Sequence, residues 1–189
     1  MLVLLIVLGI VVLLLLWLVA IYNGLVRLRA LVKEGFSGIT VQLRRRADLV
    51  PNLVATVQGY ATHEREVFDQ VTAHRADAVN AGGVAATAQA DAMMTGMLGR
   101  LMAVAEAYPE LKASQNFQDL QGELAEIEDT LQSARRYYNA TVRDLNTRIQ
   151  SFPNVMVARP MGFTEEEFYT DTDASIQTAP VVNFGAAKA

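Results

Sequence analysis

The chain has 189 residues, no cysteine and a formal net charge of −4. The missing cysteines exclude a disulfide framework and thiolate metal sites, and the small negative charge gives no electrostatic footprint for a nucleic-acid partner. Aromatic residues make up only 7% of the chain and there are 5 prolines, a composition typical of an all-α protein.

Residues 1–21 contain no charged or polar side chain and read MLVLLIVLGIVVLLLLWLVAI. As a helix with a rise of about 1.5 Å per residue, this run reaches roughly 30 Å, the thickness of the hydrocarbon core of a bilayer. A signal peptide fits less well, because no basic segment precedes the run and Ala20-Ile21-Tyr22 is a poor cleavage site. A buried core helix is usually shorter. We therefore predict one transmembrane helix over residues 1–22, with the lipid bilayer as its partner.

The charges around this helix predict its orientation. Basic residues follow the run, but none precedes it. By the positive-inside rule the N-terminus lies outside and residues 23–189 lie in the cytoplasm, as expected for a single-pass protein of the inner membrane. Near the exit, aromatic rings are expected in the interfacial belt and cations beside anionic headgroups. The predicted membrane-interface residues are Trp17, Tyr22, Arg27, Arg29 and Lys33.

The membrane helix is predicted to continue through residues 22–47, where apolar residues keep a helical spacing. Pro51 cannot lie in an unbroken helix without a kink. Either Asp48 caps a new helix with Pro51 in its first turn, or one long helix kinks at Pro51. An apolar stripe continues beyond this point to Ala78, so we expect helix up to the NAGG turn at residues 80–83.

A further helix is predicted over about residues 84–107. Its methionines suit adaptable core filling, with a promiscuous binding groove as the alternative. Small residues at i,i+4 spacing would let a neighbouring helix approach closely, and these are Ala92, Gly96, Gly99, Ala103 and Ala107. Residues 108–115 are predicted to form a loop in which Ser114 suits the N-cap of the next helix.

The clearest helix is predicted over residues 114–152. Its apolar residues form a heptad pattern with one stutter, and these are Phe117, Leu120, Leu124, Ile127, Leu131, Ala134, Tyr138, Val142, Leu145, Ile149 and Phe152. Such a helix must pack against an equally long partner, which the pattern places either in the same chain or in another copy. Acidic residues fill its first half and basic residues its second half, as suits the helix dipole.

Pro153 is expected to stop this heptad helix. The chain then divides into a transmembrane helix at residues 1–22, a cytoplasmic bundle of long antiparallel helices at residues 23–153, and a C-terminal segment at residues 154–189. We expect the last segment to be mostly irregular, with a short amphipathic stretch at Phe163–Tyr169 and an acidic tail.

The sequence contains few residues in patterns that support catalysis or metal binding. His63 and His74 lie 11 residues apart, which on one helix separates them by about 16 Å, too far for one metal ion. The paired Glu-x-x-His motifs of a di-iron bundle are missing. Gly82-Gly83 lacks the lysine and the serine or threonine of a phosphate-binding loop. We therefore expect no metal, no cofactor and no enzymatic activity.

Three consecutive arginines, Arg44, Arg45 and Arg46, would lie about 33 Å beyond the membrane exit, several Debye lengths from lipid charges. Our hypothesis is that they face the acidic first half of the heptad helix, at Glu123 and Glu126, in the same chain or in a neighbouring subunit. The alternative is a solvated basic turn.

Four stretches are distinctive: YNGLVRLR (22–29), VQLRRRADLVPNLVATVQGYATHE (41–64), LGRLMAVAEAYPELKASQNFQDLQGELAEIEDTLQSARRYYNATVRDLNTRIQSFP (98–153) and MGFTEEEFY (161–169). In order and spacing they resemble the LemA family of bacterial membrane-anchored proteins. The resemblance implies an N-terminal membrane helix, a cytoplasmic helical bundle and no established catalytic activity. One branch of that family takes part in building magnetosome membranes.

These observations favour a non-enzymatic, membrane-anchored scaffold that self-associates through its long helices into a homo-oligomer. The alternative is an adaptor or regulatory module that binds another membrane protein or a signalling protein through the methionine-rich helix and the acidic tail. An enzyme or a transporter would need a pocket or several membrane spans.

Overall fold

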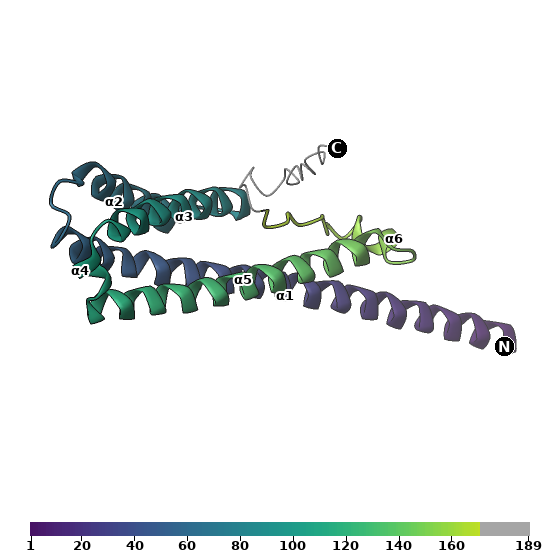
Figure 1. Ribbon diagram of the computed structural model, residues 1–189. Coiled ribbons are helices and arrows are strands. Elements are labelled where there is room, and N and C mark those ends of the chain that lie inside the picture. Colours follow the sequence, from purple (N-terminus) through teal and green to yellow (C-terminus); the bar gives the residue numbers. More distant parts are fainter. Residues whose placement is uncertain (171–189) are drawn as a thin grey trace, which may run out of the picture.

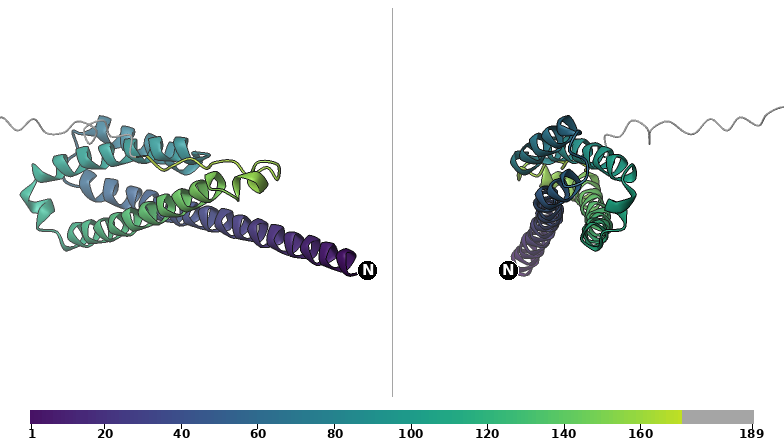
Figure 2. Two further views of the ribbon diagram at one scale, coloured as in Figure 1. Left: turned by 90° about the vertical axis from the view of Figure 1, so that its right-hand side faces the viewer. Right: turned by 60° about the vertical axis from the view of Figure 1, so that its left-hand side comes forward.

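The computed structural model describes residues 1–170, and these residues form helices and irregular segments without a strand. The predicted all-α fold is therefore confirmed. The helices are α1 (Leu2–Gln58), α2 (Arg65–Asn80), α3 (Val84–Glu106), α4 (Pro109–Lys112), α5 (Gln115–Gln150) and α6 (Val155–Ala158). Figures 1 and 2 show that α1 and α5 form a long pair and that α2 and α3 form a second layer over the C-terminal part of α1. Two residues of the predicted acidic tail, Asp171 and Asp173, lie outside the described residues.

Helix α5 packs antiparallel along α1, as Figure 1 shows. Its heptad stripe is buried at Phe117, Leu120, Ile127, Leu131, Tyr138, Val142, Leu145 and Ile149. On the α1 side, Leu25, Ile39 and Leu43 belong to the same core cluster as Leu131 and Tyr138. In this fold the equally long partner that the heptad requires is α1 of the same chain.

Gly35 allows the close approach of the two helices. A Cβ atom at Gly35 would lie 3.1 Å from the Tyr138 Cα and 3.3 Å from the Tyr137 Cδ1. These separations are shorter than ordinary van der Waals contacts between carbon atoms. At the next residue of α1, the ring of Phe36 lies 5.9 Å from the ring of Tyr138, measured between ring centres. The two helices therefore approach closely at Tyr138.

The expectation of continuous helix up to residues 80–83 is wrong. Helix α1 ends at Gln58, and the chain turns through residues 59–64 before α2 begins. The turn allows α2 to fold back, so that Phe68 and Val71 join the core formed by the end of α1 and by α3. Straight continuation would have left these apolar side chains in water, at a cost that grows with exposed area.

Pro51 lies inside α1, so Asp48 does not cap a new helix there. Proline has no N–H, and the carbonyl of the residue four positions earlier, Ala47, is left without its helical donor. The Nε of Arg75 donates to this Ala47 oxygen at 2.8 Å, and the Arg75 Nη2 lies 3.6 Å from the Asp48 Oδ1. A side chain of α2 therefore supplies the hydrogen bond that Pro51 cannot make.

Helix α3 agrees with the predicted span of residues 84–107, whereas residues 108–115 contain the short helix α4 rather than only a loop. Met94 is buried in the core, and Met97 and Met102 pack against it. Among the described residues, no neighbouring atom lies within 4 Å of a Cβ built on Gly96 or Gly99, so no other helix of this chain approaches α3 closely at these two positions.

Phe152 does not extend the heptad stripe into the core, because α5 ends at Gln150 and 81% of the Phe152 side chain is exposed. A turn containing α6 follows, and residues 163–170 then run back along α5 in an extended, irregular form, which we call the C-terminal strap. The predicted amphipathic stretch coincides with this strap. Phe163 and Tyr169 face inward and are buried, while most residues between them are exposed.

Candidate functional site

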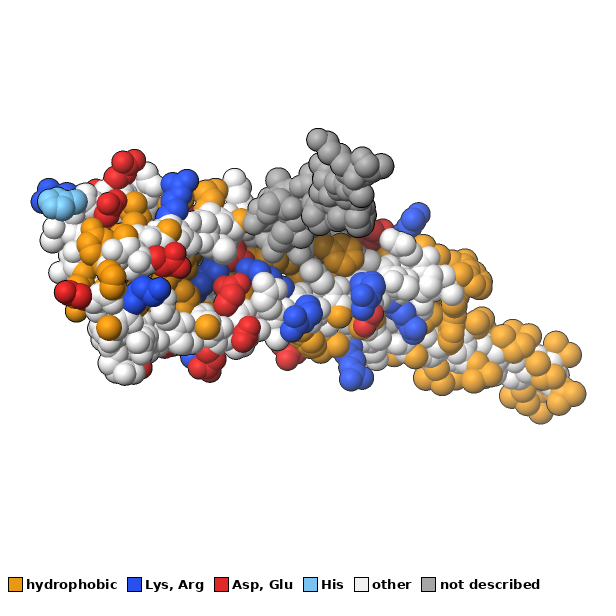
Figure 3. All heavy atoms as spheres, viewed as in Figure 1, with side chains coloured by type: hydrophobic (Ala, Val, Ile, Leu, Met, Phe, Trp, Pro, Cys, Tyr) orange, Lys and Arg blue, Asp and Glu red, His pale blue; other side chains and the backbone are white. Residues whose placement is uncertain are grey.

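The N-terminal part of α1 projects from the bundle as a bare apolar helix. Its most apolar window has a mean hydropathy of 3.5 and none of it is buried, so by length and composition this helix can cross a membrane. In Figure 3 the hydrophobic side chains cover this part on the visible face. Trp17 and Tyr22 lie toward its inner end and are 44% and 41% exposed. The predicted span is therefore available to lipid.

The three basic residues beyond the span divide into two groups. Arg27 and Lys33 are exposed. Arg29 instead turns toward the C-terminal part of the chain, where its Nη2 donates to the Gly162 carbonyl at 3.1 Å and its guanidinium lies 4.2 Å from the centre of the Phe163 ring. Arg29 thus joins α1 to the start of the C-terminal strap.

A buried ionic network, which we call the Asp91 cluster, lies in the middle of the bundle. The carboxylate of Asp91 on α3 pairs with Arg46 of α1 and with Arg135 of α5. The hydroxyl of Tyr169 on the strap donates to the same carboxylate at 2.6 Å. Arg46 also donates to the Glu128 Oε2 at 3.0 Å. The cluster joins three helices and the strap at one point.

Burial and charge explain why these ions occur together. Asp91 and Arg46 are each only 2% exposed, and an isolated charge at such depth would carry a desolvation penalty of several kcal/mol. The two guanidinium groups of Arg46 and Arg135 are balanced by the carboxylates of Asp91 and Glu128. Burial by itself lowers the pKa of the Arg135 guanidinium. The charge of the adjacent Asp91 and the hydrogen bond to it raise this pKa by more than burial lowers it, so the net shift is upward.

Of the three consecutive arginines at residues 44–46, Arg46 takes part in the Asp91 cluster. Arg46 faces inward and reaches Glu128, whereas Arg44 and Arg45 are exposed and the Arg45 Nη1 lies 3.5 Å from the Gln42 Oε1. Glu123 and Glu126 are exposed as well, and within residues 1–170 neither forms an ion pair with these arginines.

Asp91 was not singled out as a site residue in the sequence analysis. The available signal was an acidic residue in the middle of a mostly apolar helix.

The strap is held along α5 by paired hydrogen bonds. The side-chain amides of Asn139 and Asn146 each donate to a strap carbonyl and accept from a strap N–H, all at 2.9 Å, with Tyr169 and Glu166 as the respective partners. The hydroxyl of Tyr138 donates to the Glu167 carbonyl at 2.7 Å. Each asparagine thus completes the hydrogen bonding of the extended backbone, as a neighbouring strand would.

The two buried tyrosines of this region should ionise late. Burial and the nearby Glu166 and Glu167 raise the pKa of Tyr138 to about 12, and burial together with Asp91 raises the pKa of Tyr169 strongly. Because these folded-state pKa values exceed that of an unfolded tyrosine, about 10, the stability they provide is complete below pH 10 and is lost as pH rises through 12. Tyrosinate absorbance should therefore rise in at least two steps, the last one accompanied by unfolding.

Tyr138→Phe provides the control for this titration. The variant should lose part of the late step, because the buried Tyr138 hydroxyl is no longer present to ionise. A single step near the ordinary tyrosine pKa, with helix content unchanged above pH 12, would contradict the burial of both rings.

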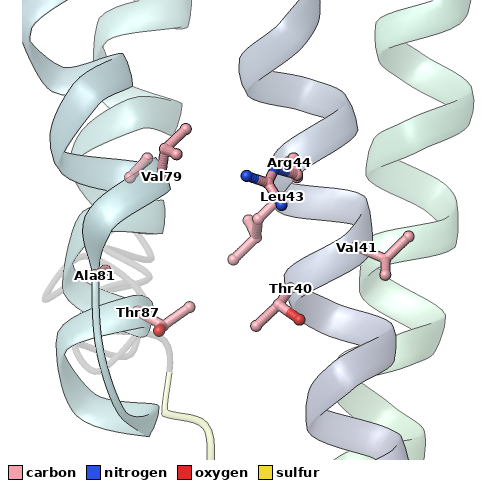
Figure 4. Close-up of a pocket in the computed structure, with 8 residues that line it drawn as sticks. Thr40, Val41, Leu43, Arg44, Val79, Ala81 and Thr87 are labelled. Atoms are coloured by element: carbon pink, nitrogen blue, oxygen red, sulfur yellow. The ribbon is translucent and has the colours of Figure 1, made fainter.

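Several hollows mark the surface of the described part of the bundle, and two of them border α1. The first has a volume of about 190 Å³ and lies between α1 and the α2–α3 connection. Figure 4 shows Leu43 and Thr40 of α1 pointing across it toward Ala81 and Thr87. The second, of about 380 Å³, is the α3–α5 groove; Arg46 and Glu128 lie at its polar edge, and its apolar lining includes Leu98, Met102 and Leu124.

The described part of the chain contains no group of three or more His, Cys, Asp or Glu side chains that could hold a metal ion. His63 lies in the turn after α1, and His74 lies on α2 with its Nδ1 3.5 Å from the Asp77 Oδ2. The two histidines therefore occupy separate places, and the Asp91 carboxylate is already engaged by arginine and tyrosine. This arrangement locks helices together and leaves no ligand set open.

Comparison with known proteins agrees with this architecture. The model of the LemA family matches residues 35–184. Magnetosome protein MamQ 2 of Paramagnetospirillum magneticum is 27% identical over 179 residues, covering 81% of this chain and 66% of that protein. Magnetosome protein MamQ of Magnetospirillum gryphiswaldense is 26% identical with the same coverage, and Protein LemA of Metamycoplasma hominis is 24% identical over 140 residues.

The chain spans about two thirds of the length of the curated relatives it matches, 66% for the magnetosome proteins and 64% for Protein LemA. The family match covers most of the bundle, including α2 to α6, the Asp91 cluster and the strap. This protein therefore belongs to the LemA family.

Proposed function

We propose that this protein is a non-enzymatic scaffold, anchored in the inner membrane by the start of α1, that self-associates side by side. The N-terminus lies outside, and the bundle lies in the cytoplasm, because the basic residues Arg27 and Lys33 follow the span. The heptad stripe is already used within the chain, so contacts between copies use the outer faces of α1 and α5.

One observation carries this proposal: the exposed residues Arg45 and Glu126, of opposite charge, lie within about 5 Å of the same height above the membrane. The 3.0 Å contact between Arg46 and Glu128 places those points of α1 and α5 level with each other. Along the helix axes, Arg45 lies about 1.5 Å nearer the membrane than Arg46, and Glu126 lies about 3 Å farther from the membrane than Glu128. Copies anchored with the same orientation therefore present Arg45 and Glu126 to each other at heights that differ by about 5 Å, within the reach of these long side chains.

Contacts of this kind are heterologous, because Arg44 and Arg45 of one copy meet Glu123 and Glu126 of the next. Heterologous contacts close into rings or continue as chains. Each exposed ion pair contributes only about 0.2–1 kcal/mol, so a single contact is weak. The two-dimensional confinement of anchored copies raises their effective concentration and favours assembly of many such contacts.

The test uses cysteine crosslinking in vesicles, since the natural chain has no cysteine. Val41 and Ser133 each lie five residues toward the membrane from the Arg46–Glu128 contact and are exposed. A mixture of Val41→Cys protein and Ser133→Cys protein should form a crosslinked dimer. Thr147→Cys is the matched control, because it lies about 21 Å nearer the membrane than Ser133 along α5 and should crosslink poorly with Val41→Cys.

Charge reversal then identifies the pairs. Arg44→Glu with Arg45→Glu in the Val41→Cys protein should lower the dimer yield several-fold, and Glu123→Arg with Glu126→Arg in the Ser133→Cys protein should restore it. A protein that remains monomeric in the membrane, with equal low yields for both cysteine mixtures, excludes the scaffold.

A second function is favoured by the α3–α5 groove. Its apolar side chains, Leu98, Met102 and Leu124, could receive the apolar stripe of a helix from another membrane protein, as in adaptor modules. Co-purification of one partner in fixed ratio, abolished by Gly99→Trp, would support the adaptor in place of the homo-oligomer. The groove residue Gly99 has open space around it, so this substitution should leave the fold intact.

A further inference from the structure

The turn that follows α5 exposes three large apolar side chains. Phe152 is 81% exposed, Met156 is 67% exposed and Met161 is 52% exposed. We call these three residues the apolar tip. Figure 3 shows hydrophobic side chains gathered over the region of α6, close to the start of the bare part of α1. Large apolar groups grouped in this way mark an interaction surface more often than isolated ones do.

The rest of the turn fixes the apolar tip beside the membrane end of α1. Val157 and Phe163 share a core cluster with Ile21 and Leu25, and Leu18 packs against that cluster. The rings of Tyr22 and Phe163 meet edge to face, with their centres 5.7 Å apart. Leu18 belongs to the last turn of the apolar run, so the tip lies level with the boundary of the hydrocarbon core.

We propose that the apolar tip inserts into the headgroup region of the membrane that α1 spans, giving each copy a second lipid contact. This inference rests on the anchoring in the proposed function. Lipid is the occupant because the structure holds the tip at the height where α1 leaves the membrane. Exposed Arg148 and Arg159 flank the turn and suit anionic headgroups, as in other interfacial segments.

A second contact has a structural consequence for the scaffold. A bundle held by α1 alone can tilt relative to the bilayer, whereas a bundle held also by the apolar tip is restricted in its tilt. The tip therefore keeps Arg45 and Glu126 of each copy at a fixed height above the membrane. Neighbouring copies then present these opposite charges at matching heights.

Fluorescence quenching of the full-length protein tests this contact. Trp17 is the single tryptophan, so the unmodified chain reports on the anchor. A variant with Trp17→Phe and Phe152→Trp reports on the tip, and one with Trp17→Phe and Tyr60→Trp reports on the far end of the bundle, where Tyr60 is 43% exposed. Each protein is placed in phosphatidylcholine–phosphatidylglycerol vesicles whose acyl chains are brominated near the headgroup.

Brominated lipid should remove at least half of the tip tryptophan's fluorescence and leave the far-end tryptophan nearly unchanged, while aqueous iodide should do the reverse. If the tip tryptophan behaves like the far-end one, or is shielded from both quenchers by protein, the inference is overturned. The unmodified chain separates the two proposals: quenching of Trp17 by brominated lipid without quenching at the tip rejects only the second contact. Absence of Trp17 quenching rejects the anchor itself.

Discussion

Asp91→Ala should lower the free energy of unfolding by about 3–5 kcal/mol, the usual cost of removing one partner from a buried ionic network. The substitution leaves the guanidiniums of Arg46 and Arg135 facing each other, with Arg46 only 2% exposed. It also leaves the Tyr169 hydroxyl without its acceptor. For a domain of this size, the melting temperature should fall by roughly 6–20 °C.

The measurement is thermal or denaturant unfolding of the full-length protein in detergent micelles, followed by helical circular dichroism. Asp129→Ala is the matched control, because Asp129 is an exposed aspartate on α5 and its loss should change stability by less than about 0.5 kcal/mol. Asp91→Asn keeps the size of the side chain but removes the charge, so most of the loss should remain. Equal, small effects of Asp91→Ala and Asp129→Ala would show that the cluster does not stabilise the fold.

Leu131→Ala should lower the free energy of unfolding by about 2–5 kcal/mol, as expected for deleting a buried leucine side chain and leaving a cavity. Leu131 is 0% exposed and lies in the core cluster between α5 and α1, together with Ile39 and Leu43. Because this contact between α5 and α1 lies within one chain, the decrease in the free energy of unfolding should be the same at every protein concentration.

Concentration dependence separates the two roles that a heptad stripe can have. If Leu131 packed against another copy, the melting temperature of the unmodified protein would rise with concentration, and Leu131→Ala would weaken that rise. Gln132→Ala, at an adjacent exposed position on α5, is the control and should be nearly neutral. A loss that appears only at high protein concentration would place the stripe between copies.

Because the heptad stripe packs within the chain, the outer faces of α1 and α5 are the surfaces used in the proposed contacts between copies. With α5 covered by α1 along its apolar side, the exposed part of α5 carries charge instead: Glu123 and Glu126 in the half far from the membrane. On α1, Arg45 is exposed within about 5 Å of the height of Glu126. In the proposed scaffold, association between copies depends on charge and on membrane confinement more than on apolar burial, and it should weaken at high salt.

The features that could be predicted from the sequence are those that depend on residues close together along the chain. The length of the apolar run at residues 1–21 predicts a helix able to span a membrane, and the three-four spacing from Phe117 to Ile149 predicts a long helix with one buried stripe. Both signals repeat over many turns, so local composition is sufficient to place them. The resemblance to the LemA family used the same local blocks and is confirmed.

Features formed by distant segments required the tertiary structure. The reversal at residues 59–64 depends on burying Phe68 and Val71 against α1 and α3, which no local pattern encodes. The Asp91 cluster joins residues 45 and 44 positions apart along the chain, and the strap depends on asparagines of α5 that resemble any other polar helix residue in sequence. Period and composition determine which segments are helical, whereas the pairing of charges and backbone groups is decided only when the folded chain brings them together and excludes water.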